Sequence, residues 1–439
     1  MLTELEEVIT YKSVQDDAER SAAIVNTWRK RLSGIQQDVG MWQKLLRLHS
    51  MVLRPILDLD TWIKYVNMCR KTGQMTIARN AIFQLLQDES NYLEELHGAD
   101  IQKIPHKLLI QVHEYARLKA QMAQQQQQRQ HSLDGRGLAY MAGKNDGGLE
   151  STSLDMAVRL SQHPALVYMY LKYKWAIGER RDAFQMIETF ASDYSSKVGF
   201  DLQAPEAFAD HIDARALESY NGHMGVADDS KTIHLLSRFY FKRAEWLVKI
   251  EQRHLLVQEA RTKAGLGHKD ELHSLRQSTR ASTNARRSGR GSVSAGSGAN
   301  GAIMASSSGV ALAGDGGSQM DQDCEYLYKL KGDRIKETIL ESYHAATVLD
   351  RKWYKAWHSL ALRHFFETQQ YSEEHSSVTE DIIEKHVVPA VNGFFRAIQL
   401  SKSDTTLQDT LRLLTAWFNY SKYERVAQAV QDRFNTVSI

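Results

Sequence analysis

Three segments of the sequence carry closely spaced basic side chains, and these come nearest to a recognisable binding chemistry. The three groups are Lys172, Arg180 and Arg181, then Arg238, Lys242 and Arg243, then Arg351, Lys352 and Lys355. In a repeat protein, corresponding positions of successive repeats line one groove, where such cations can bind a polyanion such as an inositol phosphate. Acidic neighbours such as Glu179 and Asp182 favour a solvated helix face instead, on composition alone.

Sequence motifs of catalysis are missing. The chain contains no H-R-D, D-F-G or V-A-I-K string, so it holds no protein-kinase catalytic core of its own. Gly143 and Lys144 lack the upstream glycine and the Ser or Thr of a phosphate-binding loop, and His113-Glu114 lacks the second histidine of a metalloprotease helix. We therefore expect no catalytic residue in this chain.

The 17 histidines raise the question of a metal site. His106 with His113, and His358 with His364, are the closest suggestive pairs. Neither pair has the spacing of four residues, or the neighbouring cysteine, that is typical of zinc ligands. We expect these histidines to lie on helix surfaces or between helices, and we predict no metal ligand.

Composition excludes several classes of protein. The 439 residues include 55 Lys and Arg against 53 Asp and Glu, so the net charge of +2 does not indicate a globally basic nucleic-acid binder. Two cysteines, Cys69 and Cys324, exclude a disulfide scaffold and indicate the cytosol or the nucleus. No apolar run reaches the length of a membrane span, and the acidic N-terminus does not fit a signal peptide.

Apolar residues recur at helical spacing through most of the sequence. Two such stripes are Ile24, Val25, Trp28 and Leu32, and, near the C-terminus, Leu407, Leu411, Leu414, Trp417 and Phe418. Only five prolines interrupt the chain, and no alternating pattern with hairpin turns is present. The sequence therefore predicts an all-α protein.

Three segments also fit degenerate tetratricopeptide-like helix pairs, in which small residues let two antiparallel helices approach. The matching positions are Trp62, Tyr65, Cys69, Gly73, Ala78 and Ile82, then Tyr170, Lys174, Gly178, Ala183 and Ile187, then Trp357, Leu360, Ala361 and His364. We expect Gly73 and Gly178 to form the turns between paired helices. Stacked pairs of this kind predict an α-solenoid.

Two segments break the helical pattern. Seven of the ten residues from Gln121 to Gln130 are Gln, and residues 276–314 are rich in Ser, Gly and Ala with five arginines and no acid. Such compositions bury too little apolar surface to offset the entropy of ordering. We predict disordered insertions at 121–153 and 276–320, with helical repeats at 1–120, 154–275 and 321–439.

Four blocks of sequence together resemble a known family. These are MLTELEEVITYK, TWIKYVNMCRKTGQ, DRKWYKAWHSLA and VVPAVNGFFRAIQLS…LQDTLRLLTAWFNY. In this order they resemble the FAT region of the target of rapamycin (TOR) kinases, which are Ser/Thr protein kinases of the phosphatidylinositol-3-kinase-related family. The resemblance covers nearly all of the residues that we expect to be ordered, and the two insertions have no counterpart in it.

The resemblance implies a regulatory role. In TOR kinases the FAT region is an α-solenoid that clamps the kinase domain and precedes the rapamycin-binding bundle. We interpret the chain as a non-catalytic fragment of this region, truncated before that bundle and the kinase domain, with Met1 as an internal methionine. The parent protein would transfer the γ-phosphoryl group of ATP, bound with Mg²⁺, to Ser or Thr in growth-control signalling.

Ligands and partners follow from the same resemblance. FAT regions of this family carry a basic pocket for inositol hexakisphosphate, and the candidates here are Lys172, Arg180, Arg238, Lys242 and Lys355. The implied partners are the protein's own kinase domain and the TOR complex subunits, without nucleic acid. The implied location is the cytoplasm, with recruitment to endolysosomal or vacuolar membrane surfaces through partners.

Two other functions remain open at this point. A free-standing tetratricopeptide-type adaptor would bind partner peptides in its groove, but it would need polar capping helices at both ends. An RNA-processing repeat protein could use Arg286, Arg287 and Arg290, but this segment lacks interleaved aromatic residues and the net charge is close to neutral.

Overall fold

The computed structural model describes residues 2–35, 38–99, 106–134, 147–208, 226–285, 316–374 and 379–401, together with Gln408 and Thr410. Within these residues every regular element is a helix and there is no strand, which confirms the predicted all-α class. The chain forms two compact units, residues 1–200 with 211–239, and residues 201–210 with 240–439.

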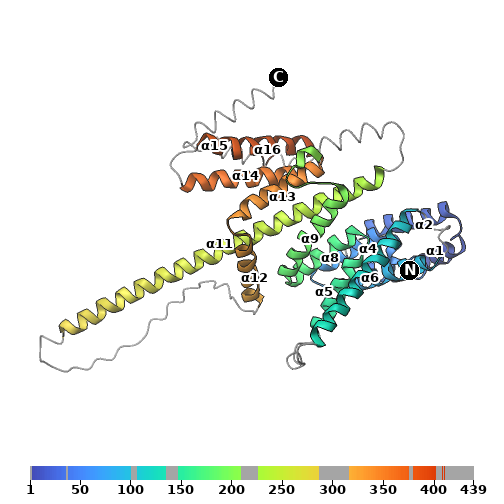
Figure 1. The fold of residues 1–439 in the computed structure, drawn as a ribbon, viewed down its shortest axis with the longest axis horizontal. Helices are drawn as coiled ribbons and strands as arrows, with labels where there is room; N and C mark the ends of the chain where they lie inside the picture. The colour runs from blue at the N-terminus through green and yellow to red at the C-terminus, as the bar shows by residue number, and fades with distance from the viewer. Residues whose placement is uncertain are drawn as a thin grey trace, which may run out of the picture. The chain divides into compact units, whose positions relative to one another are not determined.

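The first unit is built mainly of helices that follow one another along the chain (Figure 1). They are α1 (Leu2–Ser13), α2 (Ala18–Gly34), α3 (Val39–His49), the 3₁₀ turn η1 (Pro55–Asp58), α4 (Leu59–Lys71), α5 (Met75–His97), α6 (His106–Asp134), α7 (Gly147–Leu160), α8 (Pro164–Ile177) and α9 (Arg180–Val198). Helix α11 (Val226–Ala285) begins in this unit and continues into the second.

The second unit contains the rest of α11 and the helices that follow it. They are α12 (Gly316–Lys331), the 3₁₀ turn η3 (Gly332–Arg334), α13 (Ile335–Leu349), α14 (Tyr354–Glu374), α15 (Glu380–Ile382), the π turn η4 (Ile383–Val387) and α16 (Val388–Leu400). Helices α14 and α16 lie side by side (Figure 1).

Local sequence signals set the ends of several helices. The carboxylate of Asp17 accepts the backbone N–H groups of Glu19 and Arg20 and so caps α2. Gly73, with φ of 77°, separates α4 from α5, and Gly178, with φ of 103°, ends α8. Because left-handed backbone is strained for other residues, glycine is the residue that permits both turns, as the sequence analysis expects.

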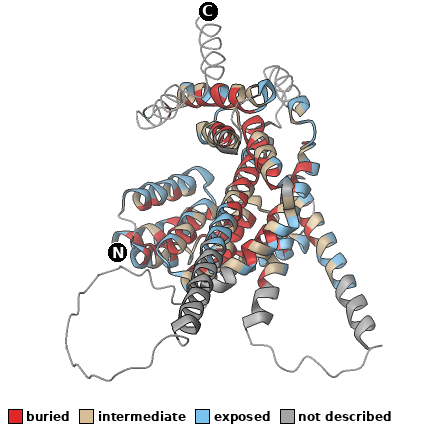
Figure 2. Cartoon of the chain, turned by 90° about the vertical axis from the view of Figure 1, so that its left-hand side faces the viewer, coloured by how far each residue is buried: buried red, intermediate tan, exposed pale blue. Residues whose placement is uncertain are grey.

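Small residues bring the paired helices into contact in the first unit. Ala78 of α5 and Ala183 of α9 are completely buried, at the positions where the sequence predicts close approach. Trp62, Tyr65 and Cys69 of α4 are also buried, as the repeat pattern predicts. Buried residues follow the inner faces of these helices while the outer faces are exposed (Figure 2).

Helices α14 and α16 of the second unit approach each other closely at Gly393. A Cβ atom added to Gly393 would lie 2.9 Å from the Cβ of Ala361 and 3.2 Å from the carbonyl oxygen of Trp357. Ala361, Val391 and Phe394 belong to one buried cluster around this crossing. The absence of a side chain at Gly393 therefore sets the spacing of the two helices.

A π turn precedes this crossing. Residues Ile383–Val387 form the wider turn, and Pro389 follows near the start of α16. Proline has no N–H to donate, and its ring would clash with the carbonyl group of Lys385 in a regular helix. The wider turn relieves this conflict while the chain continues as a helix.

The helices are longer than the sequence predicts at three points. Helix α6 continues through the Gln run to Asp134, α11 continues to Ala285, and α12 begins at Gly316. Gln, Arg and Ala are good helix formers that can extend an existing helix, and the two disordered insertions stay predictions. Residues 135–146, 286–315 and 411–439, including the predicted stripe at Leu411–Phe418, lie outside the described residues.

None of the helices in the described part of the chain combines the length and the apolar composition needed to cross a bilayer.

Replacing Gly393 by Val should loosen the crossing of α14 and α16. The added side chain meets Ala361 and the backbone of Trp357, so we expect a loss of about 2 kcal/mol, within the usual range for an overpacked core. Hydrogen exchange of the amides in α14 and α16 measures the change. Gly34→Val is the matched control, since no atom lies within 4 Å of a Cβ at Gly34. Equal exchange in both variants would contradict the packing constraint.

Candidate functional site

The five candidate phosphate-binding residues divide between the two units. Lys172, Arg180 and Arg238 belong to the first unit, and Lys242 and Lys355 to the second. The two units are described separately, so a single phosphate-binding site that contains all five residues remains a prediction.

Each candidate has its own local surroundings. The Nζ atom of Lys172 lies 4.4 Å from the ring centre of Tyr168. Arg180 begins α9. A nitrogen of Arg238 lies 3.2 Å from Nε2 of His234. Lys242 forms an ion pair with Glu245, and the Nζ atom of Lys355 lies 6.0 Å from the ring centre of Tyr354.

Arg70 is a further cation of the first unit that the sequence analysis did not single out. It lies in the last turn of α4, and its Nε atom is buried without a hydrogen-bond partner among the described residues. Burial lowers the pKa of Arg70, and the hydroxyl of Tyr168 acts in the opposite direction. Arg70 and Lys172 therefore both approach Tyr168, on the facing helices α4 and α8. The Arg70-Lys71 dipeptide in the family-like block was the available sequence signal.

Lys174 forms the centre of a buried charge network in the same unit. Its side chain is 1% exposed, and its Nζ atom lies 2.5 Å and 2.7 Å from the two carboxylate oxygens of Asp155 on α7. The Tyr170 hydroxyl donates a hydrogen bond of 2.6 Å to the same carboxylate, and burial together with this bond raises the pKa of Tyr170. Glu179 and Asp182 lie 3.2 Å and 3.7 Å from the ammonium group.

The acids around Lys174 exclude it from anion binding, since they satisfy its charge. Lys174 is one of the matching positions of the repeat pattern, and it is buried. The pattern did not identify Asp155 as its partner.

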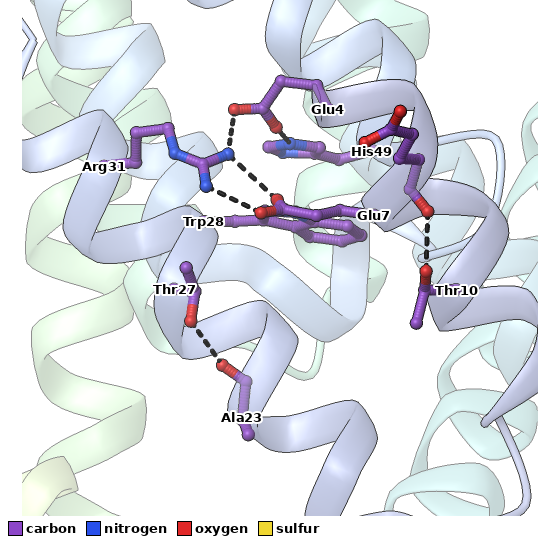
Figure 3. Close-up of polar contacts among 9 residues, drawn as sticks. Glu4, Glu7, Thr10, Ala23, Thr27, Trp28, Arg31 and His49 are labelled. Atoms are coloured by element: carbon purple, nitrogen blue, oxygen red, sulfur yellow. Dashed lines mark hydrogen bonds and ion pairs between the residues drawn. The ribbon is translucent and has the colours of Figure 1, made fainter. Parts of the chain in front are cut away.

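A second network joins α1, α2 and α3 (Figure 3). Arg31 binds the carboxylates of both Glu4 and Glu7, which lowers the pKa of Glu7. Nε2 of His49 lies 3.0 Å from the Glu4 carboxylate, and the His49 ring stacks on Trp28 with 4.1 Å between ring centres. The indole N–H of Trp28 donates a 2.8 Å hydrogen bond to Glu7.

Two carboxylates beside a histidine are groups that can transfer protons in catalysis. Here Arg31 neutralises both carboxylates, and both Glu4 and His49 are buried. The arrangement therefore holds the first three helices together instead of presenting groups to a substrate.

A third network lies in the second unit. Arg363 of α14 binds Glu251 of α11 through two nitrogens, one at 2.9 Å, and also pairs with Glu367 one turn later. Lys336 of α13 lies 3.4 Å from the Glu367 carboxylate. These charges connect α11, α13 and α14 at a buried site.

His358 and His364, one of the histidine pairs flagged in the sequence, have different neighbours in the structure. His364 contacts His386 with 3.1 Å between the Nδ1 atoms, whereas the ring of His358 lies beside Phe394. Burial is the main cause that lowers the pKa of both His364, to about 3, and His386. Among the described residues, no three His, Cys, Asp or Glu side chains gather where one metal ion could bind them.

Replacing Lys174 by Met should destabilise the first unit. Asp155 would lose its cation inside the packing, and breaking a buried pair costs about 3–5 kcal/mol. We expect about 2–3 kcal/mol here, because Asp155 remains 24% exposed and can regain water. Chemical denaturation measures the loss. Lys172→Met, on the same helix, should cost less than about 1 kcal/mol, and equal losses in the two variants would contradict the role of the buried pair.

Comparison with known proteins assigns the chain to a family. The FAT domain family matches residues 1–135, 138–266 and 318–415. The chain is 26% identical over 438 residues to "Serine/threonine-protein kinase tor1" of Schizosaccharomyces pombe and 23% identical over 471 residues to "Serine/threonine-protein kinase TOR2" of Saccharomyces cerevisiae. It is 26% identical over 454 residues to "Serine/threonine-protein kinase TOR" of Oryza sativa.

These alignments include 100% of this chain but only 12–13% of each relative. They confirm the resemblance to the FAT region of TOR kinases that the sequence blocks suggested. On the evidence of the matched residues and the helical fold, the chain belongs to the FAT domain family.

Proposed function

We propose that this chain is a regulatory scaffold segment of a TOR Ser/Thr protein kinase and that it clamps the kinase domain. The observation that carries the proposal is the alignment of the whole chain with TOR kinases from fungi and a plant. The sequence itself contains none of the kinase motifs. The segment would therefore act on the catalytic domain through its conformation.

The physical basis of such control is a difference in binding energy between two kinase conformations. A scaffold changes activity only if it interacts more strongly with one conformation than with the other. Ion pairs with a buried cation, Lys174–Asp155 in one unit and Arg363–Glu251 in the other, join neighbouring helices as such a scaffold would need. The kinase domain of the parent enzyme would bind ATP and Mg²⁺ and would contain the catalytic residues.

The setting of this function follows from the same homology. We infer that the partners are the protein's own kinase domain and TOR complex subunits, in the cytoplasm or at endolysosomal or vacuolar surfaces. The adaptor alternative has less support, because each of the three relatives compared here is a protein kinase that extends far beyond the aligned segment.

The clamp can be tested in the full-length kinase that contains this sequence. Gly393→Val should alter the rate of substrate phosphorylation by several-fold, because it loosens α14 against α16 while leaving the catalytic residues untouched. Gly34→Val should leave the rate within twofold. An unchanged rate in the Gly393→Val enzyme, despite faster hydrogen exchange in α14 and α16, would contradict control by this segment.

We also propose that the basic residues of the FAT segment bind inositol hexakisphosphate. The supporting observation is Arg70, a half-buried cation whose buried Nε atom has no hydrogen-bond partner in the described part of the chain and which lies near Tyr168, as Lys172 does. A phosphate group would supply the missing negative charge. Arg180 and Arg238 would extend the site in the first unit, and Lys242 and Lys355 are the candidates of the second.

Calorimetric titration with inositol hexakisphosphate tests this site. Arg70→Met and Lys172→Met should each weaken binding about tenfold, since one charge-assisted hydrogen bond contributes about 1.5–3 kcal/mol. Lys44→Met removes an exposed lysine of α3 and serves as the control. Binding that all three variants retain, or that the unaltered chain lacks, would remove the support for a phosphate site.

A further inference from the structure

Glu89 is a buried carboxylate at the joint between two consecutive helices. It belongs to α5, is 2% exposed, and lies beside residues 161–163, which connect α7 to α8. One carboxylate oxygen accepts the backbone N–H of Gln162 at 2.7 Å. The Ser161 hydroxyl and the backbone N–H of His163 also interact with the carboxylate. A single side chain thus interacts with three consecutive residues of the joint.

No cation pairs with this carboxylate in the described part of the chain, unlike several other acids of the first unit. On α6, Glu114 pairs with Lys197 of α9 at 2.8 Å. On α7 and α8, Asp155 and Lys174 bind each other. On η1, Asp58 binds Arg29. The charges of these three acids are compensated by cations, whereas an ionised Glu89 has hydrogen-bond donors alone.

Other titratable groups near Glu89 do not supply a positive charge near neutral pH. Burial lowers the pKa of the His163 ring, which keeps it uncharged. Tyr194 and Asp193 of α9 face the same region, and the pKa of Tyr194 is raised by burial and by nearby acids, Glu89 among them. Ionisation of Glu89 therefore places an unpaired negative charge inside the first unit.

The contribution of Glu89 to the stability of the folded chain depends on pH. Burial raises the pKa of Glu89 from 4.5 to about 7. A carboxyl group whose pKa is higher in the folded state contributes most stability at low pH. The contribution of Glu89 is fully present below about pH 4.5 and is lost as the pH rises through about 7.

We propose that the joint between α7 and α8 is a proton-responsive element, which closes when Glu89 takes up a proton and opens when Glu89 releases it. The protonated carboxyl group can donate to the Ser161 hydroxyl while it still accepts from Gln162, so the joint keeps its hydrogen bonds without a buried charge. The ionised form gains hydration if the joint opens and exposes Glu89 to water. The inference does not depend on the proposed kinase function, since it concerns one packed joint.

Hydrogen exchange across residues 155–170 of the whole chain, followed by mass spectrometry at pH 6 and pH 8, tests the element. Comparison with Glu89→Gln at each pH removes the intrinsic effect of pH on exchange. Relative to this variant, exchange in the wild-type joint should become about tenfold faster between pH 6 and pH 8, as a pKa shift from 4.5 to about 7 requires. A ratio that does not change with pH would overturn the proposal.

Two further variants keep the test decisive. Glu95→Gln removes an exposed acid of the same helix and should behave like the wild-type chain at both pH values. If Glu89→Gln fails to fold, Ser161→Ala replaces it. Loss of the hydroxyl that stabilises the ionised carboxylate should raise exchange in the joint at pH 8 and extend its pH-dependent increase above pH 7. Identical pH profiles in the Ser161→Ala and wild-type chains would overturn the proposal.

Discussion

Close approach of paired helices is the constraint on which the rest of the structure depends. A solenoid has no single large core, so each helix pair must exclude water with its own side chains. Ala183 in the first unit and the contact of Ala361 with Gly393 in the second provide the necessary proximity. Where two backbones approach this closely, the larger residues beside them, such as Phe394, fill the remaining space.

Buried charges give these interfaces their specificity. Apolar stripes on many helices are interchangeable, whereas a buried Lys174 is tolerated only where Asp155 meets it. Arg363 imposes the same requirement on Glu251, and Arg31 on Glu4. Such pairs add little net stability compared with apolar packing, but a mispaired helix would leave a charge without a partner. Glu89 has hydrogen-bond donors in place of a cation, which makes its interface sensitive to protons.

The sequence predicted the helices and the turns between them better than it predicted which residues pair across helices. The turns at Gly73 and Gly178 and the buried Ala78 follow from local signals and helical period, so they could be predicted. The pairing of Arg363 with Glu251 joins residues 112 positions apart and depends on how the helices stack, which no local pattern encodes. The same holds for Arg70, whose Nε atom has no hydrogen-bond partner among the described residues because of how the unit folds.

The π turn at Ile383–Val387 makes the length of this segment as important as its composition. A π turn holds one residue more than an α turn, and each residue of an α-helix rotates the chain by about 100°. Deleting one residue here would restore a regular helix. The residues before the deletion would then be rotated about the helix axis, and Ile382 would turn away from the cluster around Phe365. Related sequences should therefore conserve the residue count between this turn and Pro389 more strictly than the identity of the side chains.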